Sequence, residues 1–183
     1  LDPGNAGAHG NHGTALQALQ RYDEALASHQ RAVQLQPARA IGHYNLGNIL
    51  QHLERHQEAI ASLDRALALQ PDYPEALNNR ATSLRALGRN AEALASCDAA
   101  LRLRPGFTDA LYNRACLLRD MQRIEDALAG FTQLLAISPE HAYAEGIRLH
   151  LQLQCCDWTD YHARVQHISS AVAEGRRVDL PFS

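Results

Sequence analysis

Apolar residues recur at helical spacing in paired segments along most of the chain. Residues 40–53 and 56–69 form one such pair, and each places apolar side chains three and four positions apart. A short polar turn, Glu54-Arg55, separates the two segments, and Gly88-Arg89 takes the same place in the following pair. The pattern therefore predicts a succession of helical hairpins.

The spacing of the prolines indicates that these hairpins have a constant length. Five of the seven lie 34 residues apart, at positions 3, 37, 71, 105 and 139. When the chain is aligned on this period, some columns are mainly alanine and others are leucine or isoleucine. The columns are Ala25, Ala59, Ala93 and Ala127; Ala32, Ala66, Ala100 and Leu134; Leu16, Leu50, Leu84 and Leu118; and Leu35, Leu69, Leu103 and Ile137. The alanine columns predict close helix crossings, and the leucine columns predict apolar seams.

Each turn carries an arginine that is followed three residues later by an acid. The pairs are Arg21 and Glu24, Arg55 and Glu58, Arg89 and Glu92, and Arg123 and Asp126. The acid falls in the first turn of the second helix, where it favours the helix dipole, and the arginine can reach it. We expect these pairs to be structural.

A helical hairpin of 34 residues that ends in proline resembles the tetratricopeptide repeat. The eighth position is small, as in that family, and reads Gly13, Gly47, Ala81 and Ala115. The fourth position, which is aromatic in the family, reads His9, His43, Leu77 and Leu111, so a variant packing is expected there. The resemblance implies an all-α fold in which helix-turn-helix repeats stack into a right-handed superhelix, an α-solenoid.

This interpretation divides the chain into repeats and flanking segments. They are the tail of a preceding repeat (1–5), four complete repeats (6–39, 40–73, 74–107 and 108–141), the first helix of a fifth (142–154), and a capping helix with a linker toward a catalytic domain (155–183). We expect the chain to be a piece of a longer array.

The sixth position of every repeat is asparagine: Asn11, Asn45, Asn79 and Asn113. Asparagine is a poor residue for a helix interior, so local stability does not explain the choice. First helices are expected to line a concave groove, where each amide offers a donor and an acceptor to one peptide unit of an extended ligand. We predict that the four asparagines bind peptide backbone. The alternative is that they bond to a neighbouring helix and hold repeats together.

Residues one turn on either side extend the predicted groove. Four positions before each asparagine come Gly7, Ile41, Glu75 and Asp109, and three positions after it come Thr14, Asn48, Thr82 and Cys116. Glu75 and Asp109 are candidates for selecting hydroxyl or basic ligand side chains, although they fit solvated charges equally well. The second set is small and mostly polar, which predicts an open groove floor and adds Asn48 to the peptide-binding candidates.

The C-terminal segment contains the only tryptophan of the chain, Trp158. Asp157 can cap the helix that follows, whose predicted apolar stripe is Trp158, Tyr161, Val165, Ile168 and Val172. The hexapeptide from Cys156 to Tyr161, behind an array that carries the asparagines, resembles the junction in protein O-linked N-acetylglucosamine (O-GlcNAc) transferases, here a bacterial-type relative.

This second resemblance implies that the chain is the acceptor-recognition arm of a glycosyltransferase that transfers GlcNAc from UDP-GlcNAc to serine or threonine of proteins. In that family inward-facing asparagines hold the acceptor backbone, and aspartates one turn earlier influence acceptor choice. The four asparagines match the first role, and Asp109 and, more loosely, Glu75 match the second. The catalytic lobes are expected beyond Ser183. UDP-GlcNAc is therefore expected as donor of the parent enzyme, with no catalytic residue or cofactor in this segment.

Two other kinds of binding protein remain as alternatives. One is a free-standing adaptor or scaffold with no catalytic domain. The other is a receptor for chaperone tails, which in this fold clamps a terminal carboxylate with lysine and arginine. The chain has no lysine, and asparagine rather than arginine occupies the sixth position of every repeat. Both features argue against the carboxylate clamp.

Composition narrows the partners further. All 17 basic residues are arginine, they are scattered among acids, and the net charge is −3, so neither nucleic acid nor an anionic membrane is expected as a partner. No apolar run approaches about 18 residues and no signal peptide is evident, so a cytoplasmic location is the default.

The histidines and cysteines predict no metal site. His52 and His56 lie on opposite sides of a turn, and adjacent Cys155 and Cys156 suit neither a metal nor an ordinary disulfide. His9 and His12 are expected to fill core positions. Cys97 shares a column with Leu63 and Phe131 and is expected to be buried.

Overall fold

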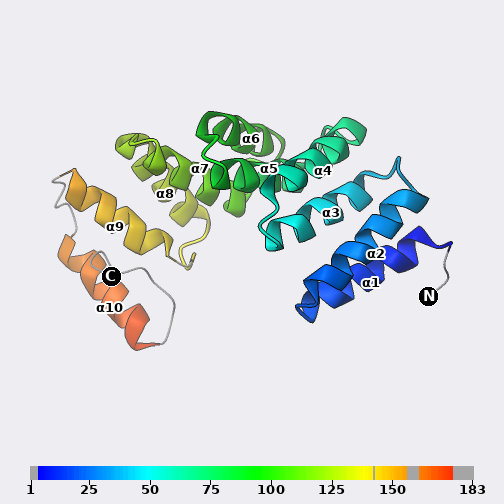
Figure 1. The fold of residues 1–183 in the computed structure, drawn as a ribbon. Helices are drawn as coiled ribbons and strands as arrows, with labels where there is room; N and C mark the ends of the chain where they lie inside the picture. The colour runs from blue at the N-terminus through cyan, green and yellow to red at the C-terminus, as the bar shows by residue number, and fades with distance from the viewer. Residues whose placement is uncertain (1–3, 142, 156–160, 175–183) are drawn as a thin grey trace. The chain divides into compact units, whose positions relative to one another are not determined.

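A computed structural model describes residues 4–141, 143–155 and 161–174, and these residues form helices and no strand. The helices are α1 (Ala6–Ala18), α2 (Tyr22–Leu35), α3 (Ala40–His52), α4 (His56–Leu69), α5 (Pro74–Ala86), α6 (Asn90–Leu103), α7 (Thr108–Asp120), α8 (Ile124–Ile137), α9 (Ala144–Gln154) and α10 (Tyr161–Ala173). The predicted all-α fold of helical hairpins is confirmed (Figure 1).

The chain divides into two compact units, and the first, Leu1–Arg104, contains the hairpins α1–α2, α3–α4 and α5–α6. Within this unit α2 packs on α3 and α4 packs on α5, so consecutive hairpins are stacked (Figure 1). The first helices also touch one another, α1 against α3 and α3 against α5. Equivalent positions of neighbouring repeats are thereby brought to one side of the unit.

The second unit, Pro105–Ser183, contains α7 to α10, with α7 packed on α8, α8 on α9 and α9 on α10. Helix α9 lies where the first helix of a fifth repeat is predicted. In α10, Ile168 is buried and Val165 is half-buried, but Val172 is 45% exposed, so the predicted apolar stripe is wrong at its C-terminal end. Asp157, Trp158 and most of the junction hexapeptide lie outside the described residues.

The predicted core columns are confirmed with one exception. Ala25, Ala59, Ala93 and Ala127 are all fully buried, and the column from Leu16 to Leu118 is at most 4% exposed. The column of Leu35 is not a continuous seam, because Leu103 and Ile137 are 42% and 49% exposed. All four residues of the column end their helices, and Leu35 and Leu69 are half-buried.

Small residues at the eighth position are required by packing in the first two repeats. A Cβ atom on Gly47 would lie 2.7 Å from Leu63 Cγ, and one on Gly13 would lie 2.8 Å from the His29 ring. Such distances are far inside van der Waals contact. The first helix of a hairpin therefore crosses the second at these positions.

The hairpin turns share one backbone geometry. Gln20, Glu54, Gly88 and Gln122 all have positive φ, between 57° and 71°. The next residue, an arginine, donates its amide to the carbonyl five positions back, as from Arg55 N to Leu50 O at 2.9 Å. This arrangement ends the first helix with a left-handed residue. The predicted ion pairs follow directly, for example Arg55 with Glu58 at 2.7 Å.

Candidate peptide-binding groove

The asparagines occupy the same register in their helices. Asn11, Asn45 and Asn79 are each the sixth residue of α1, α3 and α5 in the first unit, and Asn113 is the sixth residue of α7 in the second. Asn11 is exposed, and Asn45 and Asn79 are half-buried. Because α1 touches α3 and α3 touches α5, the three amides of the first unit follow one another across neighbouring helices.

The amides of Asn11, Asn45 and Asn79 have no recorded hydrogen-bond partner among the residues that the structure describes. The half-buried Asn113, by contrast, has an intramolecular interaction, and its alignment with the other three stays a prediction. An amide has two donors and an acceptor, and on these three side chains none is engaged by another described residue. The three asparagines of the first unit are therefore available to a ligand.

Other residues than these asparagines, two glutamines among them, make side-chain bonds between repeats. Gln17 of α1 donates to Asn48 Oδ1 of α3 at 3.2 Å, and Gln51 of α3 donates to the Asn79 carbonyl and to Ser83 Oγ of α5. Asn48, a predicted peptide-binding residue, thus has one oxygen already engaged. Gln17 and Gln51 were not predicted, although they share one position of the 34-residue period.

The two predicted acids have different surroundings. Glu75 forms an ion pair with Arg104 at 2.6 Å, a partner 29 residues away in sequence. Partial burial raises the pKa of Glu75, but the hydrogen bond from Arg104, a hydrogen bond from the backbone and the positive charge of Arg104 together hold the pKa below its ordinary value. Asp109 is exposed in the first turn of α7, in the second unit. Glu75 and Asp109 thus belong to different units, and their role as one set of acceptor-selecting acids stays a prediction.

The predicted groove floor is only partly open. Thr14 and Thr82 are exposed and Asn48 is half-buried, whereas Cys116 is 2% exposed. The prediction of an open floor is wrong at Cys116, because its thiol packs in the core of the second unit rather than at the surface.

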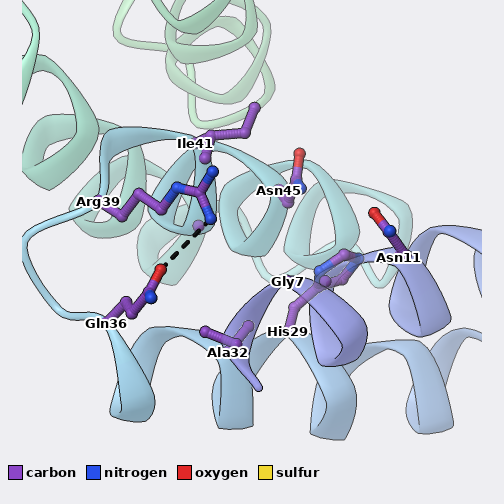
Figure 2. A pocket seen from close by; sticks show the side chains of 11 residues that line it. Gly7, Asn11, His29, Ala32, Gln36, Arg39, Ile41 and Asn45 are labelled. Atoms are coloured by element: carbon purple, nitrogen blue, oxygen red, sulfur yellow. Dashed lines mark hydrogen bonds between the residues drawn. The ribbon is translucent and has the colours of Figure 1, made fainter. Parts of the chain in front are cut away.

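Two pockets lie on either side of Asn45. One, of about 270 Å³, is formed by α1, α2 and α3, and Figure 2 shows Asn11 and Asn45 toward one edge and Arg39 and Ile41 toward the other. The other, of about 390 Å³, is more open and is lined by Thr14, Gln17, Tyr22, Asn45, Asn48 and His52. The ring of Tyr22 stacks on His52, with centroids 5.3 Å apart. Asn45 thus lines both of these pockets.

A tetratricopeptide repeat model matches residues 11–74 and 53–106, and a second model of the repeat matches residues 109–141. The first model alone spans more than half of the 183 residues. The chain belongs to the tetratricopeptide repeat family. A comparison with curated protein sequences finds no match.

Solved tetratricopeptide repeat proteins have a similar fold. YrrB, described as a TPR protein with an unusual peptide-binding site, is 22% identical with a TM-score of 0.70, and the match covers 85% of this chain and 80% of that one. MamA 41-end from Desulfovibrio magneticus RS-1 is 17% identical with a TM-score of 0.79, covering 93% and 95%. The first TPR of Spaghetti (RPAP3), bound to the HSP90 peptide SRMEEVD, is 20% identical with a TM-score of 0.63, covering 67% and 97%.

The positions of the histidines agree only in part with those predicted from the sequence. His52 ends α3 and His56 begins α4, so the two are separated by the turn as predicted. His12 is exposed and its Nδ1 lies 3.0 Å from Ser28 Oγ, so the expectation that it fills the core is wrong. His9 is half-buried. Within the described ranges no three histidine, cysteine or acidic side chains gather where they could hold a metal ion.

One buried histidine was not predicted. His29 is 1% exposed and stands in the column of Leu63, Cys97 and Phe131, all fully buried as expected for Cys97. The sequence signal that could have identified His29 is that the other three residues of its column are apolar.

Among the described residues there is no helix long and apolar enough to cross a membrane.

Proposed function

We propose that the chain binds extended protein segments along α1, α3 and α5, and that Asn11, Asn45 and Asn79 hold the backbone of the ligand. The observation that carries this proposal is the set of three amides at one helical position without intramolecular partners in the described part of the chain. The inter-repeat bonds of Gln17 and Gln51 make a purely structural role for the asparagines unnecessary.

Geometry favours recognition of backbone over recognition of side chains. Packed helices lie roughly 8–10 Å apart, and an extended chain advances about 3.3 Å per residue, so a ligand would meet one amide at about every third residue. Two solved proteins of this fold are described by a peptide-binding site or a bound peptide, which supports the proposal by analogy.

The test is a double substitution of the two half-buried amides, Asn45→Ala with Asn79→Ala. We expect affinity for a panel of unrelated extended peptides to fall about tenfold or more, because one or more hydrogen bonds are lost at each site. Circular dichroism should show unchanged helicity. Gln30→Ala with Gln57→Ala is the matched control, since both amides are exposed on second helices. Equal affinities of wild type and the asparagine variant for every peptide would remove the asparagines from the mechanism.

We further propose that this surface serves as the acceptor-recognition arm of an O-GlcNAc transferase-like enzyme in the cytoplasm. The support is the sequence resemblance of Cys156 to Tyr161 to the junction of that family. In the proposed reaction, C1 of GlcNAc leaves the β-phosphate of UDP-GlcNAc and bonds to a serine or threonine Oγ of the acceptor, releasing UDP and a proton. Asn113 and Asp109 are the candidate acceptor-binding residues of the second unit.

Incorporation of labelled GlcNAc into protein by the full-length gene product tests this enzymatic proposal. A glycosyltransferase-like region encoded after Ser183, with transfer from UDP-GlcNAc, would support it. A stop codon directly after Ser183 would instead favour the alternative, a free-standing adaptor that binds proteins without modifying them.

A further inference from the structure

The pocket of about 270 Å³ in the first unit is lined by many small residues. Its lining includes Ala6, Gly7, Gly10, Ala32 and Gly42, with the amides of Asn11 and Asn45 at its edge (Figure 2). It therefore opens beside two of the proposed backbone-binding residues.

Packing does not require glycine at two of the three glycine positions of this pocket, Gly10 and Gly42. A Cβ atom on Gly10 would meet nothing within 4 Å, and one on Gly42 would make an ordinary contact with Val33 at 3.4 Å. By contrast, Gly13 has no room for a Cβ because the His29 ring lies 2.8 Å from its position. Glycine weakens a helix relative to alanine. The effect of Gly10 and Gly42 is to keep the pocket open.

His29 is a buried polar residue in the lining of this pocket. The side chain is 1% exposed, and neither ring nitrogen has a hydrogen-bond partner in the part of the chain that the structure describes. Burial lowers the pKa of His29, so the ring is neutral and has one donor and one acceptor. Buried polar groups are normally paired. An unpaired imidazole lining a pocket points to a ligand that carries a hydroxyl group.

We propose that this pocket binds a tyrosine side chain of the ligand peptide, with the phenol hydroxyl paired to His29. The proposal rests on the proposed peptide-binding function. A cavity of about 150 Å³ admits benzene, so the larger volume here admits a phenol ring. The glycine and alanine residues of the lining leave room for the ring, and His29 is among the residues that line the pocket.

Other ligand side chains fit the pocket less well. Serine and threonine would leave most of its volume unfilled. Lysine and arginine would bring a cation beside Arg39, which lies at the pocket edge with its guanidinium bonded to Gln36 Oε1 at 3.3 Å. A carboxylate would have to lose its water beside a neutral imidazole.

The experiment uses p-cresol, the side chain of tyrosine, as its probe and toluene as the comparison. Titration into the protein labelled with ¹⁵N at histidine should give a saturable shift of the His29 ring signals with p-cresol. Toluene should bind about tenfold more weakly, because it lacks the hydroxyl. His29→Phe should abolish the difference between the two probes.

Gly10→Leu fills the pocket from a position with free space and should abolish binding of p-cresol. Ala15→Leu, an exposed change on the same helix outside the pocket, is the matched control and should retain it. The proposal is overturned if p-cresol gives no saturable shift, or if Gly10→Leu binds it as wild type does.

A peptide assay separates this proposal from the proposed function. Gly10→Leu should weaken only peptides that contain tyrosine, whereas Asn45→Ala with Asn79→Ala should weaken all of them. Binding of p-cresol at His29 in a chain that binds no peptide would sustain the pocket and refute the groove. Peptide binding with no preference for tyrosine would sustain the groove and refute the tyrosine assignment.

Discussion

His29 combines features that single residues of a helical core rarely combine. It is titratable, almost fully buried and unpaired within the described residues, and it lies against Gly13, the one neighbour whose missing side chain makes room for it. An imidazole in such a place is stable only while it is neutral. Protonation of the His29 ring would therefore destabilise the packing of the first hairpin.

This link predicts a pH-dependent stability. Burial lowers the pKa of His29 in the folded state, whereas the unfolded chain has the ordinary value of about 6.5. The unfolded state therefore binds the proton more readily, and stability is complete above that value and lost as the pH falls below it. Urea unfolding of His29→Phe should show a pH dependence that is flatter than wild type by at most about 1.4 kcal/mol per pH unit below about pH 6.5. Parallel curves for the two proteins would contradict this account.

The hairpin turn is the element that sets the repeat, because it reverses the chain between two packed helices. Each described turn has a left-handed residue, yet three of the four are not glycine: Gln20, Glu54 and Gln122. Left-handed backbone is unfavourable for a residue with a Cβ atom. These turns are formed because helix packing on both sides demands them, and they hold some strain.

Substitutions at the turn should therefore act in opposite directions. Gly88→Ala is expected to lower the free energy of unfolding by about 1 kcal/mol, and Glu54→Gly to raise it by a similar amount, because only glycine adopts this backbone without a steric penalty. Chemical denaturation measures both. Gly106→Ala is the control, since Gly106 has space for a Cβ and no positive φ, and it should not be destabilising. A neutral Gly88→Ala would show that the turn relaxes to another conformation.

At the scale of the whole molecule, the repeats are held by contacts between neighbours. In each unit a helix packs on the helix before it and the helix after it. Stability in such an array is approximately a sum of repeat and neighbour contributions rather than the property of one central core. The core residues Leu50 and Leu118 have equivalent positions in different units.

Leu50→Ala and Leu118→Ala should accordingly have local effects. Each is expected to cost about 2–5 kcal/mol because it leaves a cavity in its own hairpin. Hydrogen exchange should accelerate most in α1 to α4 for Leu50→Ala and in α7 to α9 for Leu118→Ala. Equal acceleration along the whole chain in either variant would mean that the two units unfold as one.

The sequence by itself determined the period, the helical hairpins and the identity of the core columns. These features depend on spacing along one helix and on the residue that can occupy a turn, and both are local properties of the chain. The alanine column at Ala25 and the ion pairs of the turns were predictable for this reason.

Only the tertiary structure decided which polar side chains of the groove have partners. Glu75 reaches Arg104 and Gln17 reaches Asn48 across 29 and 31 residues, and no spacing rule along the chain predicts such pairs. The burial of Cys116 and the pocket at His29 likewise depend on how one helix is rotated against the next. Periodicity specifies the face of a helix, whereas the contacts on that face depend on the lengths of side chains that meet from different repeats.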